Sequence, residues 1–368
     1  VKYELTENYR SQQSIIAFAN SWASNIRHRL KTDPIVGIQT APGTVQVTSY
    51  PHPQLLVPVA RAIAGTALAG SSCVLVRTNE EAMLLAGVLA QQGLRAKLIQ
   101  SNDSFDLNNL FELRCFFNAL QQESDGPLIS DEDWSRAKEQ LNTLLADSDK
   151  KELLSSIIRS FEDTNTGRKY KSDWKSFLSE SKIEDFLRVD SDNIYVSTIH
   201  KAKGKEFENA FLLLNNFKPD TDALKRQVYV AITRAKSNLS IHYNARYLQE
   251  PRLEEVHYAE DANPYPEPDQ VALFLTHRDV WLGYFENIQH RIRNLSSGSP
   301  LQILQDGLAN GKGEQVVKFS KQFCDSLAVY ANKGFRITQA RVNFLVYWKH
   351  EEKGKEWVVV LARMILRK

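Results

Sequence analysis

The stretch "NIYVSTIHKAKGKEFENAFLLLN", residues 193–215, holds two apolar runs separated by a group of charged residues. Short apolar runs bounded by turn residues are typical of strands that are buried on both faces of a parallel sheet. The charged group follows the first run, and in open α/β sheets ligands sit beyond the carboxyl ends of strands. We therefore expect residues 200–206 to form a ligand-binding loop. The alternative is a solvated lysine loop between two strands.

The residues around this stretch alternate between strand and helix patterns. Apolar and β-branched runs predict strands at 44–50, 73–78, 96–100, 193–200, 209–217 and 238–244. Helical spacing of apolar residues predicts helices at 53–70, 80–93, 222–236 and within 4–30, the last entered through a polar turn with Ser11 available as its cap. This alternation predicts the α/β class, with a parallel sheet covered by helices on both faces.

The length of 368 residues predicts two domains, or one domain with an insertion. Residues 1–102 and 189–250 carry the sheet pattern, whereas 103–188 has only helical patterns and an acidic centre. We interpret 103–188 as a helical insertion and the polar, proline-containing segment 251–270 as a linker. Residues 271–368 contain fifteen Lys or Arg against eight Asp or Glu. They predict a small basic module of α+β or barrel-like type, with helices at 277–295 and 321–333 and a hairpin turning at Lys353 and Gly354.

The overall composition is that of an ordinary globular protein, with 42% hydrophobic residues, 24% charged residues and a net charge of +2. The three cysteines, Cys73, Cys115 and Cys324, form no CxxC pair, which argues against a zinc site or a disulfide framework. No apolar run reaches the length of a membrane span or a signal core. We expect a cytoplasmic protein without a membrane partner, monomeric when isolated. Because the chain begins without Met and almost directly in a motif, we expect it to be an excised fragment.

Charged residues elsewhere suggest contacts with phosphates. The segment 227–242 places Arg234 near the end of the predicted helix 222–236, and an arginine fork suits a phosphate that is being transferred. A single arginine at a helix end is more often a partner of the helix dipole. Tyr9 and Arg10 combine an aromatic face with a guanidinium, which suits a nucleotide. Lys201, Lys203 and Lys205 could face phosphates in the charged loop.

Three blocks of the sequence resemble motifs of one enzyme family. "LTENYRS" (5–11), "VSTIHKAKGKEFENAFLL" (196–213) and "VYVAITRAK" (228–236) look like motifs IV, V and VI of the superfamily 1 DNA helicases of the UvrD/Rep/PcrA type, in that order. The resemblance implies a second RecA-like domain (2A), with 103–188 as a reduced form of the mobile 2B subdomain. It implies the C-terminal part of an ATP-dependent DNA helicase or translocase acting in DNA repair.

The resemblance also implies a nucleotide site. Tyr9 would stack on the adenine, and Arg10 would reach the γ-phosphate. Gly204 would lie at the nucleotide, and Glu206 would bind the ribose hydroxyls. Arg234 would be the second γ-phosphate arginine, acting as an arginine finger. By this resemblance Arg10 and Arg234 are the catalytic residues.

A separate set of residues would hold single-stranded DNA. Thr198 and His200 match positions that contact the DNA backbone, and Arg77 and Asn79 match positions that touch DNA. The sequence departs from the family pattern at Lys205, commonly Leu, and at Lys236, commonly Arg. Neither change removes a proposed contact.

The sequence holds no GxxxxGK[ST] motif and no convincing Asp-Glu pair at the end of an apolar strand. The resemblance therefore implies that ATP binds between this chain and a missing N-terminal P-loop domain, which would also hold most of the contacts to Mg²⁺. We expect the isolated chain neither to hydrolyse ATP nor to unwind DNA, and we assign no metal ligand in it.

The basic tail is less informative. Its aromatic residues alternate as in a buried strand, which favours core packing, and five basic residues remain weak candidates for DNA contacts: Lys312, Lys318, Arg336, Arg341 and Lys349. Two alternatives to a helicase half stay open. One is a non-catalytic DNA- or protein-binding module. The other is a subunit of a helicase-nuclease, although the tail shows no convincing nuclease metal cluster.

Overall fold

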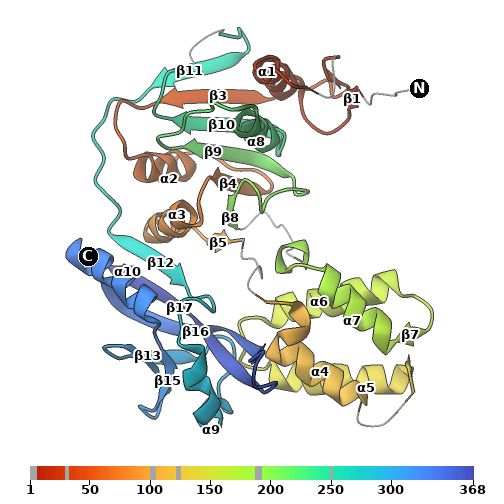
Figure 1. Ribbon diagram of the computed structural model, residues 1–368. Coiled ribbons are helices and arrows are strands. Elements are labelled where there is room, and N and C mark those ends of the chain that lie inside the picture. Colours follow the sequence, from red (N-terminus) through yellow and green to blue (C-terminus); the bar gives the residue numbers. More distant parts are fainter. Residues whose placement is uncertain (1–5, 30–32, 100–104, 122–125, 187–192, 249–251) are drawn as a thin grey trace. The chain divides into compact units, whose positions relative to one another are not determined.

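A computed structural model describes residues 6–29, 33–99, 105–121, 126–186, 193–248 and 252–368. The chain forms two compact units (Figure 1). Unit 1 comprises residues 1–99 and 188–271, and unit 2 comprises residues 100–187 and 272–368. The part boundaries expected at 102/103, 188/189 and 250/251 all lie outside the described residues.

Unit 1 is built on a seven-stranded sheet with the order β11-β3-β10-β9-β4-β8-β5, in which all neighbours are parallel. Its strands are β3 (Thr44–Ser49), β4 (Ser72–Val76), β5 (Ala96–Leu98), β8 (Ile194–Thr198), β9 (Phe207–Leu214), β10 (Ala235–Tyr243) and β11 (Val256–Glu260). Every residue of β4 and β8 is buried, as expected of central strands covered on both faces.

Helices cover both faces of this sheet. One face carries α1 (Gln13–Ser24) and α8 (Asp222–Ile232), and the other carries α2 (Leu56–Ala64) and α3 (Asn79–Gln91) (Figure 1). Apolar residues of α2 and α3 pack on Val74, Val76 and Val196 of the strands. The predicted α/β class, a parallel sheet with helices on both faces, is confirmed.

The structure corrects three local predictions in unit 1. Helix α8 ends at Ile232 rather than at residue 236, because Ala235 pairs with Phe207 and already belongs to β10. Ser11 does not cap α1, since its hydroxyl donates to the carbonyl of Ala235 at 2.8 Å and Gln12 occupies the cap position. The segment expected to be a linker, 251–270, contributes β11, which extends the sheet beside β3.

Unit 2 contains four helices in the segment that is predicted to be a helical insertion. They are α4 (Phe111–Gln121), α5 (Asp131–Leu144), α6 (Lys151–Thr164) and α7 (Lys171–Glu180), with short 3-10 turns at η1 (Leu107–Asn109) and η2 (Ile183–Phe186). Each α-helix contributes at least one aromatic ring to a common core, which includes Phe116, Trp134, Phe161 and Trp174. Neighbouring ring centroids in this core lie 5.0–5.6 Å apart.

Unit 2 also contains a six-stranded sheet with the order β12-β17-β16-β13-β14-β15, except for the first two residues of β12, which belong to unit 1. Its strands are β12 (Gln270–Phe274), β13 (Pro300–Ile303), β14 (Gly307–Ala309), β15 (Gln315–Lys318), β16 (Arg336–Lys349) and β17 (Glu356–Arg367). The expected hairpin is the β16–β17 pair, which is antiparallel, and Gly354 in its turn has φ +62°. The long helix predicted at 277–295 is replaced by η3 (Leu282–Asn287) and α9 (Gln289–Ile292), whereas α10 (Lys321–Asn332) matches its prediction.

A buried polar network joins the insertion to the basic module within unit 2. The hydroxyl of Ser297 donates to Glu112 at 2.8 Å, and the ammonium of Lys150 donates to Asn343 at 3.0 Å. Lys150 also lies over the ring of Phe344, 4.7 Å from its centroid. Burial raises the pKa of Glu112 and lowers the pKa of Lys150. Two segments that the sequence analysis treats separately thus share one interior.

Two further pairs of short strands complete the described structure: β1 (Glu7–Asn8) with β2 (Val36–Gly37), and β6 (Leu128–Ile129) with β7 (Lys169–Tyr170). Within the described ranges, each helix is too short or too polar to span a bilayer.

Candidate functional site

The charged stretch that follows β8 forms a loop, residues 199–206, leading into β9. The amide of Lys203 donates to the carbonyl of His200 at 3.2 Å, and the amide of Lys205 donates to Ala202 at 3.0 Å. Gly204 closes the loop with φ +84°, a conformation that side chains rarely adopt. Because β8 and β9 are parallel and flank β4, this loop runs from the carboxyl edge of the sheet to its amino edge.

At the amino edge, Arg10 and Glu206 form an ion pair, with 2.6 Å between Nε and Oε1. The side chain of Asn8 positions Arg10, since its oxygen accepts from the amides of Arg10 and Ser11, each at 2.9 Å. Both charged side chains remain accessible, at 41% exposure for Arg10 and 30% for Glu206. The pair is therefore open to exchange with a ligand.

Arg234 belongs to the same group. Its guanidinium donates to the carbonyls of Val230 at 3.0 Å and Lys205 at 3.1 Å, so it closes the turn between α8 and β10 against the end of the charged loop. Burial lowers the pKa of Arg234, the nearby Arg10 lowers it further, and Glu206 acts in the opposite direction. The structure thus brings Arg10, Glu206 and Arg234 together, and the group has an excess of one positive charge.

Tyr9 lies beside this group with 65% of its surface exposed. Its hydroxyl donates to Glu7, and this hydrogen bond raises the pKa of the phenol. The backbone carbonyl of Tyr9 accepts from the side chain of Gln39 at 2.7 Å. These contacts fix the backbone and the hydroxyl of Tyr9, while its ring stays exposed to solvent.

A second group of predicted residues lies at the carboxyl edge of the sheet. Thr198 ends β8 opposite Val76, which ends β4, and Asn79 begins α3 just after β4. The ammonium of Lys201 donates to the side-chain oxygen of Asn79 at 3.1 Å, and the amide of Lys201 donates to Thr198 at 3.4 Å. Lys201 links these positions, although the sequence analysis named it only as one of three loop lysines.

The remaining two DNA candidates have different surroundings. His200 is exposed, and its Nε2 lies 3.3 Å from the side-chain nitrogen of Gln227, in α8. The guanidinium of Arg77 lies over the ring of Phe217, 4.9 Å from its centroid, while its backbone amide donates to Glu81. Arg77 therefore packs against the sheet unit, whereas His200 presents its ring to solvent.

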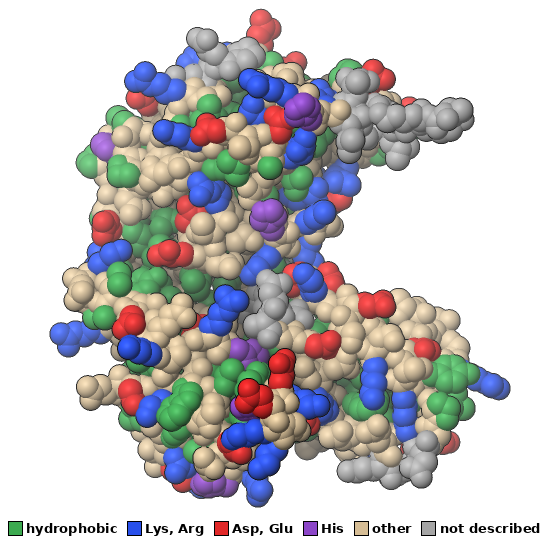
Figure 2. Space-filling model, viewed as in Figure 1, with side chains coloured by type: hydrophobic (Ala, Val, Ile, Leu, Met, Phe, Trp, Pro, Cys, Tyr) green, Lys and Arg blue, Asp and Glu red, His purple; other side chains and the backbone are tan. Residues whose placement is uncertain are grey.

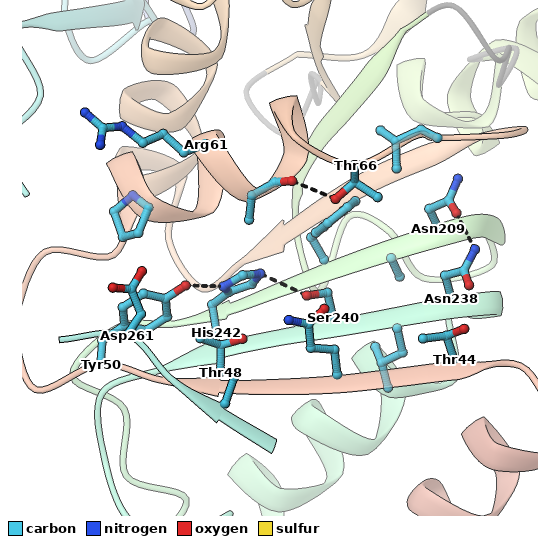
Figure 3. A pocket seen from close by; sticks show the side chains of 18 of the residues that line it. Thr44, Thr48, Tyr50, Arg61, Thr66, Asn209, Asn238, Ser240, His242 and Asp261 are labelled. Atoms are coloured by element: carbon cyan, nitrogen blue, oxygen red, sulfur yellow. Dashed lines mark hydrogen bonds between the residues drawn. The ribbon is translucent and has the colours of Figure 1, made fainter. Parts of the chain in front are cut away.

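A pocket of about 490 Å³ lies elsewhere in unit 1, on the face of β3, β9 and β10 beside α2 (Figure 3). None of the predicted site residues lines it. His242 lies in the pocket between the hydroxyls of Tyr50 and Ser240, 2.8 Å and 3.0 Å away (Figure 3). Burial lowers the pKa of His242 to about 4, so the imidazole is neutral at pH 7. This pocket was not predicted from the sequence. The alternation of polar and apolar residues within 44–48 and 238–242 is the signal that could have indicated it.

Positively and negatively charged side chains are mixed on the face that Figure 2 shows. Figure 2 shows Lys and Arg side chains intermixed with Asp and Glu over the viewed face, in keeping with the net charge of +2. Among the weak candidates of the tail, Arg336, Arg341 and Lys349 lie on β16, and Lys312 and Lys318 flank or end β15. Within the described ranges, no group of three His, Cys, Asp or Glu residues could hold a metal ion.

Residues 3–130 and 132–246 match the family model of the UvrD-like helicase C-terminal domain, and these ranges span more than half of the sequence. Among solved structures, the C-terminal domain of a possible DNA helicase from Lactobacillus plantarum WCFS1 is 12% identical, with 68% of this chain and 98% of that chain covered and a TM-score of 0.34. At this TM-score the similarity carries no weight for fold or function. No curated protein matches the chain.

Proposed function

Because the chain belongs to the family of UvrD-like helicase C-terminal domains, we propose that it supplies the nucleotide-sensing and DNA-gripping half of an ATP-dependent DNA helicase or translocase. The assignment of residues 5–11, 196–213 and 228–236 to motifs IV, V and VI is part of this proposal. The observation that carries it is the meeting of Arg10, Glu206 and Arg234, which come from these three separate segments.

The group at the amino edge fits a nucleoside triphosphate. Two guanidinium groups suit the terminal phosphates, since a planar fork can donate two parallel hydrogen bonds to phosphate oxygens. A carboxylate suits the ribose hydroxyls, and the exposed ring of Tyr9 offers a stacking face for the base. In the free chain Glu206 holds Arg10. ATP binding would replace that partner with the γ-phosphate and free Glu206 for the sugar.

A separate P-loop domain completes the site in this proposal. It would cradle the phosphates and hold most of the Mg²⁺ contacts. Bound Mg²⁺ would neutralise charge on the phosphates. Arg234 would then stabilise charge that develops on the transferred group, as arginine fingers do. The chain alone would neither hydrolyse ATP nor unwind DNA.

The group at the carboxyl edge suits a single-stranded DNA backbone. Lys201 and Asn79 offer donors beside Thr198, and His200 is exposed next to them. The loop 199–206 begins beside these residues and ends at Glu206, so a shift at the nucleotide would be passed along it. The loop also contacts α8 and the turn after this helix. His200 contacts Gln227 of α8, and the carbonyl of Lys205 accepts from Arg234 in the turn. This connection supports a coupling of domain closure to DNA movement.

The ATP part of the proposal is tested with the purified chain. We expect no ATP hydrolysis, with or without single-stranded DNA. Robust hydrolysis that Arg234→Ala abolishes would contradict the proposal, because that dependence excludes a contaminating enzyme.

The DNA part is tested by fluorescence anisotropy with a labelled oligo-dT. Lys201→Ala should weaken binding severalfold and make the salt dependence shallower by about one phosphate contact. Arg95→Ala is the charge-matched control, since Arg95 precedes β5 and lies at the opposite edge of the sheet. Equal losses in both variants would indicate unspecific attraction and would count against a DNA grip at the carboxyl edge.

A further inference from the structure

Unit 2 exposes one large aromatic side chain, Trp281, to an unusual degree. Its side chain is 53% exposed, although tryptophan usually contributes to a core. The alternation of aromatic residues in the tail predicts that their rings are buried. Phe344 and Trp357 are indeed buried. Trp281 is the exception, and its exposed indole is a candidate contact for a binding partner.

The backbone around Trp281 is held on both sides. Its amide donates to the carbonyl of Lys318 at 2.8 Å, and Val280 forms an antiparallel bridge with Phe319. Tyr284 extends the aromatic surface, since its ring is tilted by only 29° against the indole and the centroids lie 6.3 Å apart. The Tyr284 hydroxyl donates to the carbonyl of Gln315 at 3.3 Å. The two rings are therefore presented on a fixed support.

Cationic side chains border these two rings. The ammonium of Lys318 lies over the ring of Trp281, 5.1 Å from its centroid, and is 3.6 Å from Asp306. Both partners of this ion pair are partly exposed, at 36% and 53%, so a phosphate can compete with Asp306 for the lysine. Beyond Tyr284, the guanidinium of Arg291 donates to the carbonyl of Gln315 at 3.3 Å.

More positive charge lies next to Arg291. The side-chain amide of Asn310 donates to Glu314 at 2.9 Å. This hydrogen bond lowers the pKa of Glu314, and the nearby Lys312 and Arg291 lower it further. The surface therefore runs from Lys318 over two stacked rings to a group of basic residues.

We propose that Trp281 and Tyr284 form a stacking platform for the bases of single-stranded DNA, with Lys318 and Arg291 as contacts to its phosphates. Exposed aromatic rings bordered by cations are the combination by which proteins bind single strands without reading sequence. The inference rests on the proposed function, because it adds a second contact for the same DNA. An acidic protein segment would use the cations but would gain little from an exposed indole, so the rings favour a nucleic acid.

The experiment compares two oligonucleotides of equal length, an oligo-dT and an abasic deoxyribose-phosphate strand, in anisotropy titrations with the full chain. Trp281→Ala should weaken oligo-dT binding roughly tenfold, since it removes a stacked base, and should leave abasic binding unchanged. Trp281→Phe should recover part of the loss. Lys318→Ala should weaken the binding of both strands and flatten the salt dependence.

Two controls accompany these variants. Tyr170→Ala removes another exposed aromatic side chain of unit 2, in β7, and should bind both strands as the unchanged chain does. Asp306→Asn should tighten binding, because it removes the competing charge beside Lys318 while its remaining oxygen can still accept from Gln315. Thermal melts of all variants should agree within a few degrees.

The outcomes separate the two ideas. If Lys201→Ala weakens DNA binding but Trp281→Ala does not, the proposed stacking platform is contradicted and the proposed DNA contact at the carboxyl edge of the sheet is supported. A loss in Trp281→Ala that is equal for the abasic strand overturns stacking. If the unchanged chain binds neither strand, the proposed DNA function fails and the platform fails with it.

Discussion

Arg10 and Glu206 form an ion pair of 2.6 Å at the amino edge of the sheet, although they come from the two separate sequence segments of unit 1. Arg234 completes the group from the turn that follows α8. Because both partners of the ion pair are partly exposed, the pair contributes little to stability. Its main effect is to position the side chain of Arg10.

We predict that Arg10→Ala and Arg234→Ala each lower ATP turnover by about a thousandfold or more in a protein that joins this chain to its P-loop domain, as for other arginine fingers. Arg234→Lys should not restore turnover, because an ammonium lacks the planar fork. Steady-state hydrolysis with saturating single-stranded DNA measures the effect.

Arg246→Ala is the control for this experiment, since Arg246 is exposed and follows the carboxyl end of β10, at the edge away from Arg234. Full turnover in Arg234→Ala would remove the arginine-finger role.

Glu206→Gln should separate function from stability. The free energy of unfolding should change by less than about 1 kcal/mol, because the ion pair with Arg10 is solvent-accessible. The Michaelis constant for ATP should rise in the joined protein, since the carboxylate is lost from the proposed ribose contact. Urea titration of the chain and ATPase kinetics give the two quantities. A loss of several kcal/mol in stability would instead make Glu206 a structural residue.

Gly204→Ala tests the charged loop through its backbone alone. Gly204 has φ +84° and an added Cβ would meet no atom within 4 Å, so the expected cost is about 1 kcal/mol of backbone strain. Gly93→Ala is a matched control, with φ +75° and equally open surroundings. Both variants should lose similar stability in urea titrations, whereas only Gly204→Ala should weaken oligo-dT binding. Equal DNA binding in both would show that loop geometry does not matter for the grip.

His242 makes unit 1 sensitive to acid. Its pKa is about 4 in the folded chain against an ordinary 6.5, so below pH 6.5 the unfolded chain takes up a proton that the folded chain refuses. Stability therefore falls as pH drops from 6.5 towards 4. Between pH 7 and pH 5 the loss from this residue should be about 2 kcal/mol.

The variant His242→Gln should lack this part of the pH dependence, because glutamine can still pair with Tyr50 and Ser240 but does not titrate in this range. Urea titrations of both proteins at the two pH values provide the measurement. Parallel pH dependences would mean that the imidazole is protonated in the folded chain.

Ser297→Ala should destabilise unit 2 by about 1–3 kcal/mol, because Glu112 is 3% exposed and would lose its hydroxyl partner. Ser172→Ala, on the exposed start of α7, should change stability by less than about 0.5 kcal/mol. Thermal unfolding followed by circular dichroism compares them. Equal melting temperatures would mean that water replaces the serine without cost.

Several features of the fold were predictable because they depend on local pattern. The strands β4 and β8 are buried throughout, β9 ends in the apolar run 210–214, and α3 begins with Thr78 and Glu81 as a capping box. Such signals act within a few residues. The end of α8 was not predictable in this way, since it is decided by the pairing of Ala235 with Phe207.

The same distinction between local pattern and tertiary contacts applies to the candidate site. The sequence by itself identified the residues that carry charge and aromatic faces, among them Tyr9, Arg10, Glu206 and Arg234, because motif order and residue type are properties of the chain. Only the tertiary structure decided which of them meet, that the loop 199–206 joins the two edges of the sheet, and that Trp281 stays exposed. Contacts between distant segments depend on strand order and helix packing, and no local pattern encodes those distances.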